Sequence, residues 1–277
     1  MTRDFTIQRY RQLLTALTEA GYQFQPFNDF ILNPKGKVVI LRHDVDKRPG
    51  NSLVTAQIEN ELGIKGSYYF RIVPESFTPE IIFKIANLEH EIGYHYEDID
   101  LASGKMKKEK GVTNNEQVFT SQLINSAYEL FLIHLEEIRK LVPVNTICMH
   151  GSPLSKYDNR MMWEQYSYKS LGIIGEPYFD IDFSRVFYLT DTGRCWNGER
   201  FSIRDKVGDQ INLKGSFRKS LEIISAANSG LLPEKIMITV HPQRWSDDIC
   251  LWTKELVLQN IKNIAKGYIV KRGNAKD

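Results

Sequence analysis

Short apolar runs alternate with amphipathic stretches along most of the chain. Residues 38–41 are four consecutive aliphatic residues, mostly β-branched, which is typical of a strand buried on both faces. Further strands are predicted at residues 66–72, 91–94, 145–149, 171–175, 186–189 and 235–240. Apolar residues at helical spacing predict helices at residues 6–20, 51–62, 79–88, 115–141, 159–166, 216–227 and 249–265.

This alternation of strand and helix runs without a linker-like change in composition or a short internal repeat. It predicts one domain over residues 1–277 with a parallel sheet. The expected fold class is α/β: a single distorted (β/α) barrel, similar to a TIM barrel, with about seven parallel strands and an extra N-terminal helix. Residues 1–36 are the N-terminal covering segment, and the polar stretch at 97–111 is expected to be a solvated loop.

Composition limits the kinds of binding partner and the cellular compartment that we expect. The 36 basic and 34 acidic residues give a net charge of +2, so bulk electrostatics indicate neither nucleic acid nor an anionic membrane. Three widely spaced cysteines predict no disulfide framework and no zinc-thiolate site. The N-terminus has no signal-like apolar core, and no stretch predicts membrane insertion. We therefore expect a cytoplasmic protein with a small or neutral partner; the oligomeric state is not predicted.

Ionisable residues follow the predicted strands. Because the carboxyl ends of parallel strands meet at one rim, these residues are expected to converge. Period-2 alternation places Asp44 and Asp46 on one face of their strand and His43 on the other. Two neighbouring carboxylates repel each other unless a cation or a shared proton lies between them, which is the first indication of a metal. The residues at the strand ends are Asp44, Asp46, Arg71, His95, His150, Asp191 and His241.

Three of these strand ends carry recognisable motifs. They read Arg-His-Asp-Val-Asp at 42–46, Glu-His-Glu-Ile-Gly-Tyr-His at 89–95 and Ile-Thr-Val-His-Pro at 238–242. In order and placement they resemble the NodB-homology polysaccharide deacetylases, carbohydrate esterase family 4, over residues 38–241. The resemblance implies a distorted (β/α) barrel that removes acetyl groups from glycans with a divalent metal, zinc being expected here.

The resemblance also implies residue roles. By position, Asp44 is the catalytic base, Asp46 and His95 are metal ligands, and His241 is the general acid on the leaving group. The second metal histidine of the usual motif is missing, since Tyr96-Glu-Asp-Ile follows His95. In addition, Val45 separates two aspartates that are adjacent in most members, and the arginine-bearing third motif is not recognisable.

The missing ligand leaves three alternatives open. His150 replaces the lost imidazole, Glu97 or Asp98 supplies an oxygen ligand, or no metal binds. Arg42 or Arg71 is expected to orient Asp44 and hold it ionised. For Arg42, an ion pair that closes the barrel rim is an equally good interpretation.

Other residues are candidates for binding or support. His43 is counted among the supporting residues. Asp191 contacts substrate or orients a histidine, or else makes a local turn with Gly193. Aromatic residues near the later strand ends suit stacking on a sugar ring, although packing explains them equally well. They are Tyr178, Phe179, Trp196 and Trp245.

These observations predict a metal-dependent hydrolase that removes an acetyl group from an N-acetylated sugar or polysaccharide precursor. Two alternatives remain. One is a catalytically inactive barrel that binds a glycan, which the lost histidine suggests. The other is a hydrolase of C–N bonds in a cyclic amide or ureide.

Overall fold

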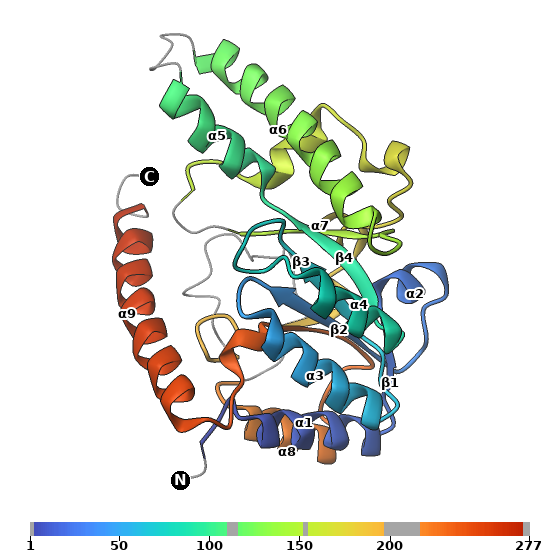
Figure 1. Ribbon diagram of the computed structural model, residues 1–277. Coiled ribbons are helices and arrows are strands. Elements are labelled where there is room, and N and C mark those ends of the chain that lie inside the picture. The colour runs from blue at the N-terminus through green and yellow to red at the C-terminus, as the bar shows by residue number, and fades with distance from the viewer. Residues whose placement is uncertain (1–2, 110–115, 152–154, 197–216, 274–277) are drawn as a thin grey trace.

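The fold is described by a computed structural model covering residues 3–109, 116–151, 155–196 and 217–273, with backbone alone for 107–109, 116–118 and 265–273 (Figure 1). The strands are β1 (Gln23–Gln25), β2 (Val38–Val45), β3 (Ser67–Phe70), β4 (Glu91–Tyr96), β5 (Ile147–Met149), β6 (Phe187–Thr190) and β7 (Lys235–Val240). The α-helices are α1 (Ile7–Glu19), α2 (Phe27–Leu32), α3 (Pro49–Glu61), α4 (Pro79–Asn87), α5 (Asp98–Glu109), α6 (Glu116–Arg139), α7 (Pro177–Asp180), α8 (Ser220–Asn228) and α9 (Ile249–Gly273). Short 3-10 helices include η1 (Asn159–Glu164), η2 (Tyr168–Leu171) and η4 (Pro242–Arg244).

The strands form one parallel sheet in the order β5-β4-β3-β2-β7-β6. The short strand β1 shares one edge of β2 with β3, because it pairs with residues 38–40 while β3 pairs with residues 42–45. The sheet curls into a half-barrel with helices on its outside (Figure 1). The predicted α/β class with a parallel, barrel-like sheet is confirmed.

The described sheet does not close into a barrel of the TIM type, which the predicted distorted barrel was expected to resemble. Within the described part of the chain, β5 and β6 lie at opposite ends of the sheet and do not pair with each other. The strand expected at 171–175 does not form. Gly172 adopts a left-handed conformation (φ 72°) at the end of η2, and the segment contributes only a bridge between Thr146 and Gly175.

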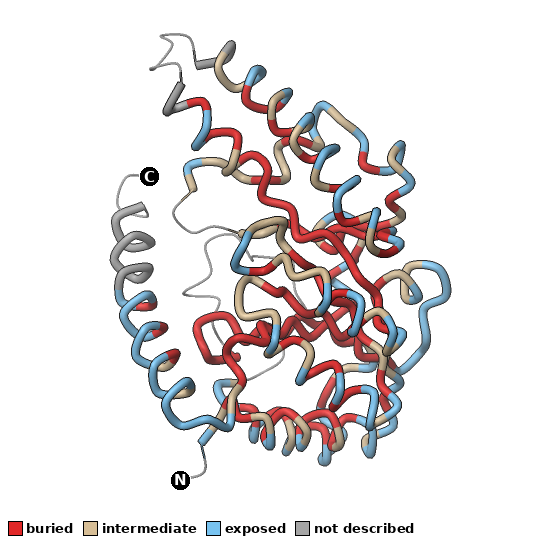
Figure 2. The backbone as a smooth tube through the Cα atoms, in the orientation of Figure 1, coloured by how far each residue is buried: buried red, intermediate tan, exposed pale blue. Residues whose placement is uncertain are grey.

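Side chains pack on both faces of the sheet. The outer face is covered by α3, α4 and α6 on one side and by α1 and α8 on the other, and most of the apolar core lies there. A smaller cluster fills the inner face, where Ile40, Tyr69, Cys148, Tyr188 and Met237 meet. Figure 2 shows the sheet as the most buried part of the chain. Residues that alternate along a strand therefore divide between the helical layer and the half-barrel interior.

Strand β2 is longer than the sequence predicts. We expected it to end where the charges begin, yet it continues through Val45 with all eight residues buried. Arg42 and Asp44 point the same way, two residues apart, and pair with each other inside the half-barrel. Mutual neutralisation lets two charges stay in a buried strand.

A glycine in the second motif makes room for an aromatic ring in this interior. Gly93 in β4 lies opposite Tyr69 in β3. A Cβ atom at position 93 would be 2.3 Å from the Tyr69 ring, far inside van der Waals contact. The Tyr69 ring can lie across this strand only because position 93 lacks a side chain.

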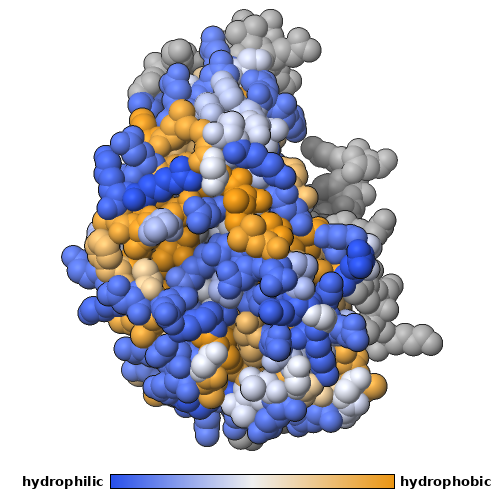
Figure 3. All heavy atoms as spheres, turned by 90° about the vertical axis from the view of Figure 1, so that its right-hand side faces the viewer, coloured by the Kyte–Doolittle hydropathy of each residue, from blue (hydrophilic) through white to orange (hydrophobic). Residues whose placement is uncertain are grey.

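Residues 98–109, expected to be a loop, form helix α5. Ile99, Ala102 and Met106 recur at helical spacing and are buried in the outer core. The segment therefore has a short apolar stripe although it is rich in lysine. None of the described helices is long and apolar enough to cross a membrane. The face opposite α9 mixes hydrophilic side chains with small apolar groups (Figure 3).

Candidate metal centre

Five of the ionisable residues predicted at the strand ends meet at one edge of the half-barrel. Asp44 lies in β2 and Asp46 directly follows it, His95 lies near the end of β4, and His150 and His241 directly follow β5 and β7. The parallel order of these strands brings residues that are up to 197 positions apart into one cluster. The side chains of Asp46 and His150 are 22% and 19% exposed, so the cluster is open to solvent on their side.

Three imidazole rings surround the Asp46 carboxylate. Its Oδ1 lies 3.5 Å from Nε2 of His95 and 3.7 Å from Nε2 of His150. Its Oδ2 lies 4.0 Å from Nε2 of His241 and accepts a hydrogen bond of 3.0 Å from Gln243 Nε2. In each ring the same nitrogen, Nε2, faces the carboxylate.

The opposite nitrogens of the first two rings have acceptors behind them. Nδ1 of His95 donates to the Cys148 carbonyl oxygen at 2.9 Å. Nδ1 of His150 lies 3.0 Å from Oε2 of Glu97, whose carboxylate also accepts two hydrogen bonds of 2.8 Å from Arg71. The acceptor behind Nδ1 of His95 keeps a proton there and leaves the Nε2 lone pair free, as in metal-binding histidines. Nδ1 of His150 lies within ion-pair distance of Glu97 but makes no hydrogen bond of good geometry.

The third ring is held by a denser group. His241 Nδ1 lies 2.6 Å from Asp191 Oδ1, and the same aspartate accepts hydrogen bonds from Arg244 Nη1 and Trp245 Nε1, each at 2.8 Å. Burial raises the pKa of Asp191, but Arg244 and His241 outweigh it and lower the pKa below its ordinary value. Asp191 is therefore an ionised carboxylate that orients His241, which is one of the interpretations that the sequence left open.

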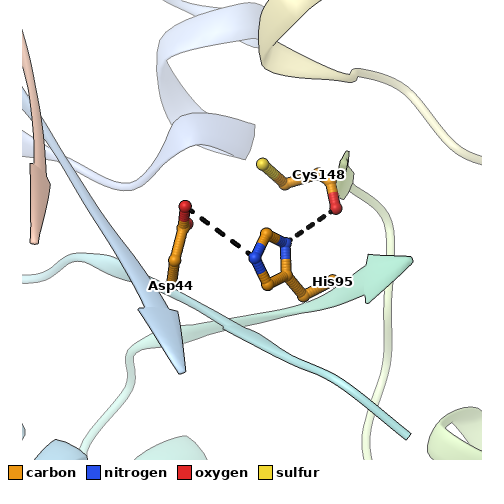
Figure 4. A group of neighbouring side chains, drawn as sticks. All are labelled: Asp44, His95 and Cys148. Atoms are coloured by element: carbon orange, nitrogen blue, oxygen red, sulfur yellow. Dashed lines mark hydrogen bonds and ion pairs between the residues drawn. The ribbon is translucent and has the colours of Figure 1, made fainter. Parts of the chain in front are cut away.

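Asp44 is held mainly by Arg42. Arg42 donates from Nε to Oδ1 at 2.8 Å and from Nη2 to Oδ2 at 2.6 Å, so both carboxylate oxygens are held. Burial raises the pKa of Asp44, but Arg42 and the neighbouring His95 outweigh it and lower the pKa to about 2. Figure 4 shows His95 between Asp44, whose Oδ2 is 3.9 Å from Nε2, and the carbonyl of Cys148. Arg42 thus takes the orienting role for which Arg71 was the alternative.

These residues fit a divalent cation. One ligand atom each from Asp46, His95 and His150 lies within 4.8 Å of the others. Two ligands at about 2.1 Å from a tetrahedral zinc ion are separated by roughly 3.4 Å, close to the distances between Asp46 Oδ1 and the two Nε2 atoms. That oxygen is buried and makes no hydrogen bond. A second group, Asp44, His95 and Cys148, shares His95 with the first and is fully buried.

Ionisation of Asp46 agrees with this fit. Burial raises its pKa, but the neighbouring rings of His95, His241 and His150 outweigh it and hold the pKa well below its ordinary value. A buried, ionised carboxylate with one oxygen lacking a hydrogen-bond donor has a free lone pair for a cation. Of the alternatives for the missing ligand, His150 is the one whose ring faces Asp46, while Glu97 lies behind His150.

Two residues predicted to support the site lie elsewhere. His43 points to the outer face, where its Nε2 is 2.9 Å from both Tyr10 Oη and Glu59 Oε1. Asp98 turns away at the start of α5, where it accepts hydrogen bonds from Tyr94 Oη at 2.9 and 2.8 Å and lies 2.7 Å from His134 Nδ1. The period-2 argument had already placed His43 on the opposite face, and Asp98 is drawn into the helical layer by its own partners.

The aromatic residues separate into buried and accessible ones. Trp196 is 4% exposed, its Nε1 donates to Ser220 Oγ, and its ring packs near Trp245, which is fully buried. Of the two interpretations of these rings, stacking on a sugar or packing, packing accounts for both, because both are buried. Tyr178 lies over the guanidinium of Arg42 at 5.2 Å, and Phe179 remains 49% exposed beside it in the chain.

Two contributors were missed by sequence reasoning. Gln243 reaches Asp46 from η4, two residues after the strand-end His241, and a His-Pro turn after a strand was the only signal for it. Glu176 accepts hydrogen bonds from the backbone N–H of Met149 and Tyr178, so it fixes the segment that leads into His150. No local pattern distinguished Glu176 from a surface glutamate.

No family model matches the chain, and neither the curated proteins nor the solved structures contain a significant match. The resemblance to NodB-homology deacetylases stays a prediction that rests on the motifs at 42–46, 89–95 and 238–242.

Proposed function

We propose that this chain is a metal-dependent hydrolase that removes an acetyl group from an N-acetylated sugar, in the manner of the NodB-homology polysaccharide deacetylases that its motifs resemble. The observation that carries the proposal is the orientation of His95 and His150. Both Nε2 atoms face one carboxylate oxygen of Asp46, and both Nδ1 atoms have acceptors behind them. Two imidazoles and a carboxylate form a ligand set that suits zinc and leaves a position open for water or substrate.

The metal ligands in this proposal are Asp46, His95 and His150. A divalent cation bound there supplies Lewis-acid chemistry, because it lowers the pKa of coordinated water and polarises a carbonyl oxygen. Glu97 positions His150, and Arg71 positions Glu97 while also donating to the backbone oxygen of Asp46 at 3.0 Å. This chain of contacts gives His150 the support that the family's missing histidine would have had.

Asp44 acts as the base. Its pairing with Arg42 keeps it ionised at neutral pH, and its position beside His95 places it next to the proposed ligands. It orients the attacking water and accepts a proton from it. Arg42 fixes the direction of the carboxylate, so the base needs no reorientation during the reaction.

His241 acts as the general acid. Asp191 accepts the hydrogen bond from Nδ1 and stabilises the imidazolium, and Nε2 then carries the proton that the leaving nitrogen needs. Arg244 and Trp245 hold Asp191 from the other side, so the ring cannot turn freely. Asp44 and His241 thereby divide the two proton transfers of amide hydrolysis between them.

The test begins with metal binding. Calorimetric titration of chelator-treated protein with zinc is expected to give one site, which Asp46→Ala or His150→Ala abolishes. His134→Ala is the matched control, because this histidine pairs with Asp98 outside the cluster, so its substitution should leave zinc binding unchanged. The same proteins are then assayed for acetate release from a panel of N-acetylhexosamines and their oligomers.

Two results would replace the proposal with another. Protein that binds no metal, and whose glycan binding survives Asp46→Ala, would be an inactive glycan-binding barrel. Zinc-loaded protein that releases no acetate from any member of the panel but opens a cyclic amide or ureide would be the alternative C–N hydrolase.

A further inference from the structure

Helix α9 has its polar and apolar faces reversed. On an ordinary surface helix the apolar stripe faces the core and the polar residues face water. In α9 the side chains buried against the body are Glu255, Gln259 and Asn263, at 3%, 5% and 9% exposure. Figure 2 shows α9 at the edge of the molecule, with buried positions only on its inner side.

The outer side of α9 is apolar. We call its exposed apolar residues the outer stripe: Ile249 (57% exposed), Leu251 (41%), Val257 (51%), Leu258 (40%), Ile261 (59%) and Ile264 (64%). Val257, Leu258, Ile261 and Ile264 recur at helical spacing on one face over about two turns, whereas Ile249 and Leu251 lie on different sides at the start of the helix. A continuous apolar face of this kind on a helix is a site of interaction rather than chance exposure.

Polar contacts fix the helix in this orientation. Glu255 lies 3.2 Å from Lys47 Nζ and 3.9 Å from Arg48 Nη1, in the loop that follows Asp46. Asn263 donates to the carbonyl oxygen of Gly193 at 2.9 Å. These contacts anchor the inner face at both ends of the described stretch, so rotation of α9 to bury the outer stripe would break them. The apolar face is held outward.

The charges on α9 identify what the outer stripe fits. Between Ile249 and Ile264 the exposed charged side chains are Lys254 and Lys262, which flank the stripe. The one acidic residue of that stretch, Glu255, is buried and paired with Lys47 and Arg48. From Lys254 to Ile264 the outward face therefore combines aliphatic side chains with positive charge, the composition of helices that lie on anionic lipid surfaces. The exposed Asp247 and Asp248 lie before the helix begins.

A second copy of the chain fits this face less well. In an antiparallel pair of α9 helices centred on Leu258, Lys254 of one copy lies opposite Lys262 of the other, and a parallel pair brings each lysine near its own counterpart. Like charges in contact weaken either pairing, whereas anionic lipid headgroups satisfy both lysines.

We propose that the outer stripe of α9 docks this protein on an anionic lipid bilayer surface, with the aliphatic side chains inserted among the headgroups and Lys254 and Lys262 bound to lipid phosphates. Glu255 pairs with Lys47 and Arg48, which follow Asp46 in the chain, so docking places the helix that meets the headgroups next to the segment that carries this proposed metal ligand. The surface attachment is independent of the metal chemistry.

Vesicle co-sedimentation of the full chain tests this. We expect binding to vesicles of mixed phosphatidylglycerol and phosphatidylcholine, and little binding to phosphatidylcholine alone. Ile261→Ser with Ile264→Ser should weaken binding at least about tenfold, through lost apolar burial. Lys254→Gln with Lys262→Gln should weaken it about thirtyfold at low salt, since each lysine near such a surface contributes about a factor of five.

The matched control is Ile133→Ser on α6, a residue 61% exposed and far from α9, which should leave binding unchanged. All five substituted positions are exposed, so circular dichroism should show the same fold in every variant. Equal sedimentation with neutral and anionic vesicles, or none with either, would overturn the proposal. So would a concentration-dependent dimer in sedimentation velocity that the double serine variant abolishes, because a second copy would then cover the stripe.

Discussion

Replacing Glu176 by glutamine should change how the stability of this protein depends on pH. Glu176 is fully buried, and its carboxylate accepts hydrogen bonds from Met149 N at 3.0 Å and Tyr178 N at 2.6 Å. Burial raises its pKa from 4.5 to about 7, because the backbone hydrogen bonds and the charge of Arg42 compensate only in part. The folded state therefore binds this proton more tightly than the unfolded chain does.

The sign and size of the effect follow from the two pKa values. Below pH 4.5 the folded and unfolded states both hold the proton, so ionisation of Glu176 does not lower the free energy of unfolding. Between pH 4.5 and pH 7 the unfolded chain releases it while the folded protein keeps it, so stability falls as pH rises. Above pH 7 both states are ionised and the loss is constant. At 1.36 kcal/mol per pKa unit, the wild type should lose about 2.5 kcal/mol between pH 5 and pH 8 relative to Glu176→Gln.

The measurement is urea unfolding of both proteins at pH 5, 6, 7 and 8. The difference between them removes the contributions of other titrating groups. Glutamine can accept one of the two backbone hydrogen bonds, so the variant carries a constant penalty of about 1 kcal/mol at every pH. Glu164→Gln, at an exposed site, is the control and should change the free energy of unfolding by less than about 0.5 kcal/mol throughout. A Glu176→Gln difference that varies by less than about 1 kcal/mol, or in the opposite direction, would refute the reasoning.

Three further substitutions test the site and the half-barrel. Glu97→Gln removes the carboxylate that positions His150, so zinc binding measured by calorimetry should weaken about 10–100-fold while the fold stays unchanged. An unaltered zinc affinity would mean that Glu97 does not position His150. Gly93→Ala places a methyl group 2.3 Å from the Tyr69 ring and should lower the free energy of unfolding by about 2 kcal/mol or more, and a stable variant would mean that Tyr69 has space to move. Asp191→Asn should reduce kcat for acetate release about 10²–10⁴-fold and shift the pH profile assigned to His241, while zinc content stays constant; loss of zinc would instead make Asp191 part of the metal site.

The set of ionisable residues in the site was predictable, because the direction of the strands alone decides at which edge of the sheet they lie. Asp44, Asp46, His95, His150 and His241 each follow or end an apolar strand, and parallel strands bring their carboxyl ends to one edge. The sequence could therefore name the members of the cluster without knowing the distances between them. It could not choose the third proposed metal ligand, because that choice depends on which side chain turns inward, and only the fold shows that Asp98 is taken by Tyr94 and His134.

The aromatic residues show the opposite case. Apolar rings near strand ends have the same local pattern whether they are packed or exposed, so sequence offered no way to distinguish Trp196, which is buried, from Phe179, which is half exposed. Helix α9 gives a similar lesson. Its spacing predicted a helix, but only tertiary contacts from Lys47 and Gly193 decide that its polar face turns inward.

By itself, the sequence determined the α/β class, the parallel direction of the strands and the set of ionisable residues at their ends, because hydrophobic periodicity and chain direction are local properties. Tertiary structure decided that the sheet stops at a half-barrel, that Arg42 and Asp44 share a buried strand, and which ring nitrogens face Asp46. Those outcomes depend on contacts between residues far apart in the chain, whose free energies no local pattern records.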